Sequence, residues 1–379
     1  MKNDQRNARL AIVETPDAHG GAQVSADLRE CMRSQRIVPG RVSVIVPVYQ
    51  GERYIVGAVR SALRQTYTNL EVLVVDDGST DGTVSRLAGL EDPRLRVLAQ
   101  ANQGTGAARD LALAQACGEY IAFLDADDRW FPRKIETEVR TLQSSPSPIA
   151  IVYSWYYAVD DDGRLLNRSR PCTLAGNVFE TILRSATEIG FLLPSVTLFH
   201  RQIFEEIGGF DAGESLHEDA VLLFKATKRF PVYPTRTYQV VYRQTVEGKC
   251  RNVLNDFEKA CDAAFSIAED LQPYLSSEQS GALREHQNRA LYFRFLMYGF
   301  GKSATRMLAT IDRGALRHGL KGWIAWLHSQ TGINLMLPLR LTIQGAYRAF
   351  GQRGWKEELL RQGLDLSYGS ERSRASTIE

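Results

Sequence analysis

Short apolar runs alternate with helix-period segments through residues 42–124, and two of the runs end abruptly in acidic clusters. Leu70–Val75 and Tyr120–Leu124 suit strands buried on both faces, and they are followed by Asp76-Asp77-Gly78-Ser79 and Asp125-Ala126-Asp127-Asp128. This alternation predicts an α/β fold on a mostly parallel sheet flanked by helices. Ligands of such sheets bind beyond the carboxyl ends of the strands, so we expect both clusters at the binding edge.

The same patterns divide the chain into three regions. Residues 1–40 are polar and lack a sustained period, which predicts a disordered leader. Residues 41–250 form the predicted α/β domain, and 251–379 a helical C-terminal region. Further strands are predicted at Val42–Val46, Leu95–Leu98, Ile149–Tyr153 and Ser195–His200, with helices at Gly51–Gln65, Thr105–Ala116 and Asp219–Lys228.

Composition limits the possible partners and compartment. The formal net charge is +2, so no global field favours nucleic acid. The five cysteines are scattered, with no C-x-x-C pair, which favours reduced thiols in a cytoplasm. No stretch of 18 uncharged apolar residues occurs, and the N-terminus lacks an apolar signal region. We therefore expect a cytoplasmic protein that neither crosses a membrane nor is exported.

Asp125 and Asp127 are candidate ligands for a cation. Two carboxylates one residue apart at a strand end repel each other unless a cation lies between them. Mn²⁺ or Mg²⁺ is the natural occupant, bound through one or two carboxylates together with substrate phosphates. The alternative is a solvated acidic turn that caps the helix starting at Pro132.

Three other segments carry candidate binding or catalytic groups. Asp77 lies in a glycine-containing turn, where it can accept a hydrogen bond from a base or ribose. Arg109, in a helix that opens with small residues, can bind phosphate, although the glycines there can equally serve packing. Glu218 and Asp219 begin a helix, where they either favour the helix dipole or supply a general base.

Taken together, these motifs resemble the family 2 glycosyltransferases over about residues 41–245. The resemblance implies a GT-A fold and an inverting, single-displacement transfer of a sugar from a nucleoside diphosphate sugar to a hydroxyl acceptor. The product would belong to a surface polysaccharide, lipopolysaccharide or cell-wall glycan. The matching segments, in the family's order, are Val44–Tyr49, Val75–Gly82, Asn102–Gly104 with Ala108-Arg109, Gly118–Asp128, and Gly208–Asp211 with Glu218-Asp219.

The resemblance also implies roles for individual positions. Asp127 would hold the metal, Asp219 would be the catalytic base, and Glu218 would position the acceptor. The nucleotide-sugar pocket would be lined by Pro47, Val48, Tyr49, Asp77 and Asp125. One departure is that Gln244-Thr245 follows Arg243, where many relatives have a histidine, which puts a further metal or diphosphate contact in doubt.

The C-terminal region suggests a membrane contact. Residues 313–356 contain no Asp or Glu, and their Arg and Lys residues are interleaved with Trp and Leu. Such a surface suits anionic lipid on the inner membrane face, close to a glycan or lipid-linked acceptor. The alternative is a helical subdomain packed on the catalytic domain.

Two rival functions stay open at this point. Paired Asp residues at strand ends also occur in Mg²⁺-dependent phosphoryl-transfer enzymes, but no strand-end lysine stands out in residues 41–245. A catalytically silent sugar-nucleotide binding protein would keep the same motifs without turnover.

Overall fold

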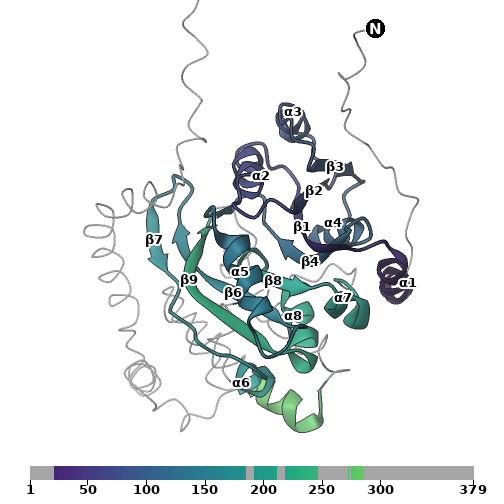
Figure 1. Ribbon diagram of the computed structural model, residues 1–379, viewed down its shortest axis with the longest axis vertical. Coiled ribbons are helices and arrows are strands. Elements are labelled where there is room, and N and C mark those ends of the chain that lie inside the picture. Colours follow the sequence, from purple (N-terminus) through teal and green to yellow (C-terminus); the bar gives the residue numbers. More distant parts are fainter. Residues whose placement is uncertain (1–20, 185–191, 211–217, 246–271, 273–274, 286–379) are drawn as a thin grey trace, which may run out of the picture.

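The computed structural model describes residues 21–184, 192–210, 218–245, 272 and 275–285, with the main chain alone for residues 21–27 and 184. Within these ranges the strands form one nine-stranded sheet in the order β3-β2-β1-β4-β8-β6-β9-β5, with β7 paired to β6 (Figure 1). The strands are β1 Val38–Val48, β2 Leu70–Asp76, β3 Leu95–Ala99, β4 Gly118–Phe123, β5 Arg129–Trp130, β6 Ile151–Val159, β7 Leu165–Arg168, β8 Thr197–His200 and β9 Val232–Arg243.

The first four strands are parallel, and the order in which strands are added to the sheet reverses at β1. Strands β2 and β3 extend the sheet on one side of β1, whereas β4 pairs with its other side. Beyond β4 the pairing becomes mixed, because β8 is antiparallel to both β4 and β6 while β9 is parallel to β6. The β1–β4 junction is therefore the switch point at which open α/β sheets bind ligands.

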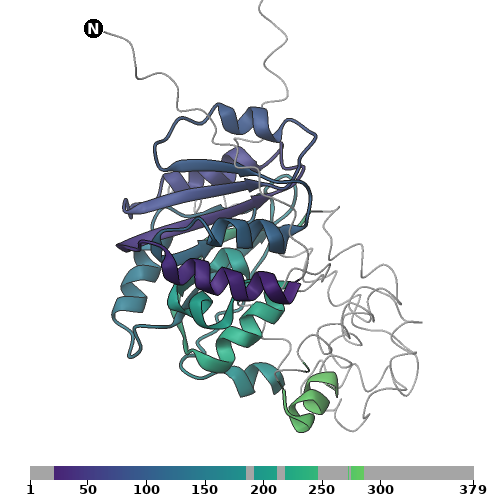
Figure 2. The same cartoon turned by 90° about the vertical axis from the view of Figure 1, so that its right-hand side faces the viewer.

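Helices cover both faces of this sheet (Figures 1 and 2). Alternate residues of β1 point to opposite faces, as strand geometry requires. Ile45 belongs to the first core, which lies under α1, α4, α6, α7 and α8. Val44 and Val46 belong to the second core, which lies under α2, α3 and α5. The helices are α1 Gly21–Ser34, α2 Ile55–Leu63, α3 Thr83–Ala88, α4 Thr105–Leu113, α5 Lys134–Gln143, α6 Phe179–Arg184, α7 Gln202–Ile207 and α8 Glu218–Arg229.

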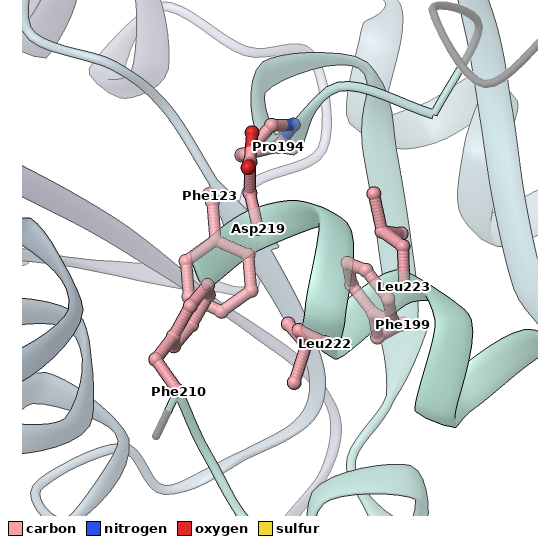
Figure 3. A pocket seen from close by; sticks show the side chains of 7 residues that line it. All are labelled: Phe123, Pro194, Phe199, Phe210, Asp219, Leu222 and Leu223. Atoms are coloured by element: carbon pink, nitrogen blue, oxygen red, sulfur yellow. The ribbon is translucent and has the colours of Figure 1, made fainter. Parts of the chain in front are cut away.

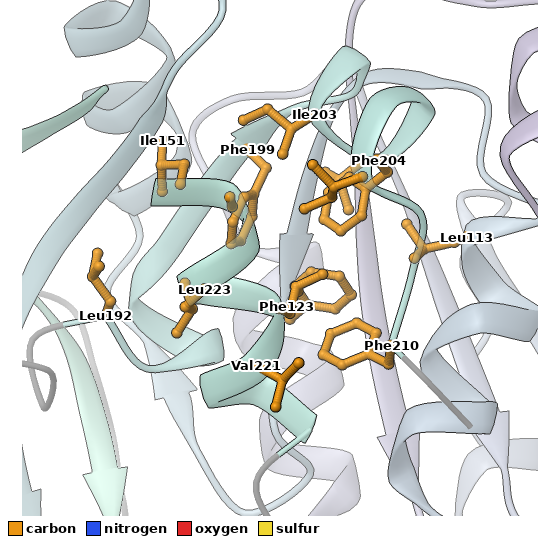
Figure 4. Packing of buried hydrophobic residues seen from close by; sticks show 14 of the residues in the cluster. Leu113, Phe123, Ile151, Leu192, Phe199, Ile203, Phe204, Phe210, Val221 and Leu223 are labelled. Carbon is orange, nitrogen blue, oxygen red and sulfur yellow. The ribbon is translucent and has the colours of Figure 1, made fainter. Parts of the chain in front are cut away.

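A cluster of aromatic rings fills the first core next to the carboxyl end of β4 (Figure 4). Phe123 makes edge-to-face contacts with Phe199, Phe204 and Phe210, with ring centroids 5.2–5.9 Å apart. Phe123 is two residues from Asp125, and Phe210 comes from the loop that leads toward α8. The rings thus fix the end of β4 relative to the segment before α8.

The sequence-based expectation of a disordered leader is wrong for residues 21–34, which form α1. Leu28 and Met32, four residues apart on one face of α1, are 5% and 0% exposed in the first core. The buried Arg201 fixes the end of this helix by donating to Met32 O at 2.7 Å. Tertiary burial of two apolar residues therefore stabilises a helix that lacks a long periodic pattern. Residues 1–20 lie outside the described residues.

The predicted α/β architecture is confirmed, while one long strand was not predicted. Strand β9 contains Pro234 and a left-handed Arg236 (φ 60°), and its register with β6 shifts in this region. These irregularities hide its period in the sequence. In the predicted C-terminal helical region, residues 277–285 are helical, and the basic segment 313–356 lies outside the described residues.

Candidate functional site

The candidate site lies where the carboxyl ends of β1, β2 and β4 meet. In the parallel register Val48 lies opposite Asp76, and Ile45 lies opposite Phe123. The next residues continue this alignment, because Asp77 N donates to Val48 O at 2.8 Å. The polar residues that follow each strand consequently emerge at a single edge, as the sequence predicted.

Among the first-strand residues expected at a nucleotide pocket, the tyrosine alone presents its side chain to solvent. Tyr49 is 54% exposed, whereas Pro47 and Val48 are buried in the sheet. Val48 packs in the second core. Pro47 and Val48 can therefore shape such a pocket through the main chain, and Tyr49 through its ring.

Asp77 is buried and ties the end of β2 to the loop before α4. Its Oδ1 accepts from Gln100 Nε2 at 2.8 Å and from Gln103 N at 2.9 Å, and its Oδ2 accepts from Gly104 N at 2.9 Å. Gly104 adopts φ 91°, a region that glycine enters without a side-chain clash. A carboxylate has about four lone-pair sites, so three bonds leave Asp77 able to accept one more from a ligand.

The turn after β4 carries three carboxyl groups in four residues. Asp128 N donates to Asp125 O at 3.0 Å, which closes the turn, and Asp125 N donates to Ser195 Oγ at 3.0 Å. Asp125 and Asp127 are part-buried, whereas Asp128 is fully buried and accepts from Arg243 N at 2.8 Å. Burial and the neighbouring Asp125 raise the pKa of Asp127 to about 6.

This turn suits a divalent cation. Burial, followed by the charges of Asp127 and Asp125, raises the pKa of Asp128 well above its usual range, because a further negative charge in this turn is unfavourable. No group of three His, Cys, Asp or Glu side chains able to hold a metal is found among the described residues. A cation bound by one or two carboxylates and completed by substrate phosphates requires no such group.

Arg109 joins the β4 turn to the start of α8. Its Nη2 donates to Asp125 Oδ1 at 2.8 Å and its Nη1 to Glu218 Oε1 at 3.3 Å, although its own side chain is 5% exposed. The guanidinium also lies over the Phe210 ring, 5.0 Å from the centroid. Arg109 is therefore a buried cation that pairs with two carboxylates at the sheet edge. These pairs bring together Arg109, Asp125 and Glu218, which the sequence analysis placed in one site.

Asp219 follows Glu218 on the first turn of α8 and lines a small cavity (Figure 3). Its Oδ1 accepts from Ala220 N at 2.8 Å. The cavity has a volume of about 10 Å³, about the space of one water molecule. Its other lining residues are Phe123, Pro194, Phe199, Phe210, Leu222 and Leu223.

Two residues near the turn were missed by the sequence analysis as site components. Ser195, in the 3-10 helix η2 Pro194–Val196, holds Asp125 N, and Arg243 ends the unpredicted strand β9. Ser195 approaches the turn from the 3-10 helix before β8 and Arg243 from the end of β9, segments that only the folded sheet brings near β4. Ser195 lies in an apolar run that gives no signal, whereas Arg243 begins the polar segment Arg243-Gln244-Thr245. Among the helices described, none is long and apolar enough to span a membrane.

Comparison with known proteins finds a matching family model for the region that contains this site. Residues 43–208 match the family model described as glycosyl transferase family 2. A Rickettsia conorii protein named an uncharacterized glycosyltransferase is 31% identical over 185 residues, which cover 48% of this chain and 30% of that protein. The matched region is thus less than a third of that relative's length.

Two further proteins are informative. The Escherichia coli protein WfgD, named UDP-Glc:alpha-D-GlcNAc-diphosphoundecaprenol beta-1,3-glucosyltransferase, is 36% identical over 122 residues, which cover 32% of this chain and 47% of WfgD. The crystal structure of S. aureus TarS 1-349 in complex with UDP-GlcNAc covers 86% of this chain and 93% of its own, with 23% identity and a TM-score of 0.51. This last likeness concerns the fold, and it agrees with the expected GT-A architecture.

Proposed function

Because the chain belongs to glycosyl transferase family 2 through residues 43–208, we propose that it transfers a sugar from a nucleoside diphosphate sugar to a hydroxyl acceptor. The transfer inverts the anomeric centre and depends on a divalent metal, Mn²⁺ or Mg²⁺. The product is part of a surface polysaccharide, lipopolysaccharide or cell-wall glycan.

One observation carries this proposal: Arg109 bonds both to the β4 turn, through Asp125, and to the start of α8, through Glu218. A displacement at a sugar carbon needs donor groups and an acceptor base on opposite sides of one reacting atom. The bridge keeps the carboxylates at Asp125 and Asp127 and those at Glu218 and Asp219 in a fixed relation. That arrangement supports one site with two functional sides.

The residues of this chain have distinct proposed tasks. Asp219 removes the proton from the acceptor hydroxyl, which becomes the nucleophile as the bond to the diphosphate breaks. Glu218 orients the acceptor, and Asp125 contacts the ribose or diphosphate. Asp77 accepts from the nucleotide base, with Tyr49 beside it. Asp127 holds the metal, which supplies positive charge for the departing diphosphate.

Relatives suggest the class of donor and acceptor. The name of WfgD specifies UDP-glucose as donor and a sugar on diphosphoundecaprenol as acceptor. We extend to this chain the chemical classes, a uridine diphosphate sugar and a lipid-linked glycan. A contact of residues 313–356 with the cytoplasmic face of the inner membrane would bring such an acceptor close. That contact stays a prediction, because the segment lies outside the described residues.

A thermal-shift screen of nucleotide sugars, with and without MnCl₂, tests the proposal and finds the donor. A ligand that binds the folded state raises the melting temperature as its concentration exceeds its dissociation constant. The expected result is a metal-dependent shift with one donor class. Absence of a shift with any uridine, guanosine or thymidine diphosphate sugar would contradict the proposal.

Two variants then separate binding from chemistry. Asp127→Ala should abolish the metal-dependent shift. Asp219→Asn should keep it and lose several orders of magnitude in turnover, as expected for removal of a general base. Asp162→Asn is the matched control, since this carboxylate is 58% exposed on a neighbouring turn. If Asp219→Asn turned over at the parental rate, Asp219 would not be the base; a parent chain that bound the donor without turnover would be a donor-binding protein.

A further inference from the structure

Arg243, the last residue of β9, donates hydrogen bonds to the turn after β4 from both its main chain and its side chain. Its Nε donates to Asp127 O at 3.2 Å, and its main-chain N donates to Asp128 Oδ1 at 2.8 Å. Arg243 is 5% exposed, so these bonds are largely shielded from water. Two consecutive residues of the candidate metal turn are thus held by one residue from a distant strand.

The far end of the same guanidinium is bound to a second turn. Nη1 donates to Asp160 O at 2.7 Å and to Asp161 O at 3.1 Å. These carbonyls follow β6, which pairs with β9 in parallel and lies opposite Arg243 at Val159. The side chain therefore links the β4 turn to the end of β6 through three carbonyl oxygens in fixed directions.

An aromatic ring lies against the guanidinium. The Arg243 guanidinium carbon lies 4.6 Å from the centroid of the Tyr54 ring. The Tyr54 hydroxyl in turn donates to Asp161 Oδ1 at 3.1 Å. Stacking on the ring and bonding to the carbonyls restrict the guanidinium to one orientation.

We propose that Arg243 is a positioning residue that holds the Asp125–Asp128 turn in the conformation in which its carboxylates bind a divalent cation. This inference rests on the proposed function. The bonds from the side chain go to main-chain carbonyls, so their contribution is geometric as well as electrostatic. A lysine at this position would keep the positive charge but has one nitrogen in place of a planar fork, and it cannot reach three carbonyls with the same directions.

The chain offers a matched control in Arg53. This arginine lies on the same ring, with its guanidinium carbon 5.0 Å from the Tyr54 centroid, and it donates to Asp161 O at 3.4 Å. Its side chain is 57% exposed, and it makes no hydrogen bond to Asp127 or Asp128 in the described structure. Arg53→Lys therefore perturbs the ring and the second turn without touching the metal turn.

The experiment measures binding of Mn²⁺ alone to the full chain by the electron paramagnetic resonance signal of the free ion. Loss of a residue that orients metal ligands lowers metal affinity by roughly 10- to 100-fold. The expected result is a rise of that size in the Mn²⁺ dissociation constant for Arg243→Lys and no change for Arg53→Lys. In turnover, excess Mn²⁺ should recover much of the lost rate, so the half-activating concentration of Mn²⁺ rises more than kcat falls.

Circular dichroism and thermal unfolding establish that the variants are folded. Should Arg243→Lys fail to fold, Tyr54→Leu carries the same test, because it removes the stacking ring while leaving every residue of the metal turn in place. It is expected to weaken Mn²⁺ binding by a smaller factor of the same sign.

The outcomes separate this inference from the proposed function. Parental affinity for Mn²⁺ in folded Arg243→Lys would overturn the positioning role and leave the transferase proposal intact. Equal losses in Arg243→Lys and Arg53→Lys would also overturn it, since they would trace to the shared ring and second turn. A parent chain that binds no Mn²⁺ would contradict the metal dependence itself, and the inference would fall with it.

Discussion

The guanidinium of Arg109 donates to the carboxylate of Asp125 at 2.8 Å, from a side chain that is 5% exposed to one that is 29% exposed. The buried guanidinium thus pairs with a carboxylate that is partly exposed at the surface. The other terminal nitrogen, Nη1, bonds to Glu218, which begins a helix more than a hundred residues away in sequence. This pairing ties the β4 turn, the proposed donor side of the site, to the start of α8, the proposed acceptor side.

Replacing Arg109 by Gln should lower the free energy of unfolding by about 2 kcal/mol, because two carboxylates lose their shared cation. Breaking a fully buried ion pair costs roughly 3–5 kcal/mol, and partial exposure of both acids reduces the cost. Urea denaturation measures it. Arg140→Gln, which breaks an exposed pair with Glu136, should cost less than about 0.5 kcal/mol. Equal losses in the two variants would contradict the structural role of Arg109.

Asp127→Asn should stabilise the chain in EDTA while removing its stabilisation by Mn²⁺. The turn after β4 concentrates carboxylates that repel one another, so neutralising one of them favours the metal-free fold. Functional sites often carry such a cost in stability. Thermal unfolding with EDTA and with MnCl₂ gives both effects. A lower melting temperature for the variant in EDTA would show that the Asp127 charge is already compensated.

His200 should make the chain less stable as the pH falls below about 6.5, the ordinary pKa of histidine. Burial lowers the pKa of His200, and the opposing charges of Glu119 and Glu205 do not offset it. Gln202 N donates to Nδ1 at 3.2 Å, so the folded state keeps the neutral ring with its proton on Nε2. Between the lowered pKa and 6.5 the unfolded state binds more protons, and stability decreases with acidification.

The measurement compares the parent with His200→Gln in urea at pH 7.5 and pH 5.5. The parent should lose more stability between these two pH values than the variant does. Carboxyl groups elsewhere titrate in both proteins, so the difference isolates the histidine. Identical losses would mean that His200 is readily protonated in the folded chain.

Met32→Ala should destabilise the chain by about 2–4 kcal/mol, the usual cost of removing a large buried side chain. Met32 lies on α1 and is 0% exposed in the first core. Glu30→Ala is the control on the same helix, because Glu30 is exposed and its replacement should change little. A negligible effect of Met32→Ala in urea denaturation would mean that α1 is not part of the stable domain.

The sequence predicted the parallel half of the fold because its signals are local. Runs such as Leu70–Val75 are apolar on both strand faces, and each is followed by glycine or acidic residues that end it. Strand β9 was missed because Pro234 and the left-handed Arg236 interrupt its period. Helix α1 was missed because its stability comes from Leu28 and Met32 contacting distant helices.

For the site, the sequence by itself determined which residue types stand at the ends of β1, β2 and β4. Parallel pairing then brings those ends to one edge, so the grouping of Asp77 with Asp125 and Asp127 follows from the strand pattern. Only the tertiary structure decided that Arg109 bridges Asp125 to Glu218 and that Arg243 bonds to Asp127 and Asp128 in the turn after β4. The bonds of Arg109 to Glu218 and of Arg243 to Asp127 join residues more than 100 positions apart, and their geometry depends on packing across the whole sheet, which no local pattern encodes.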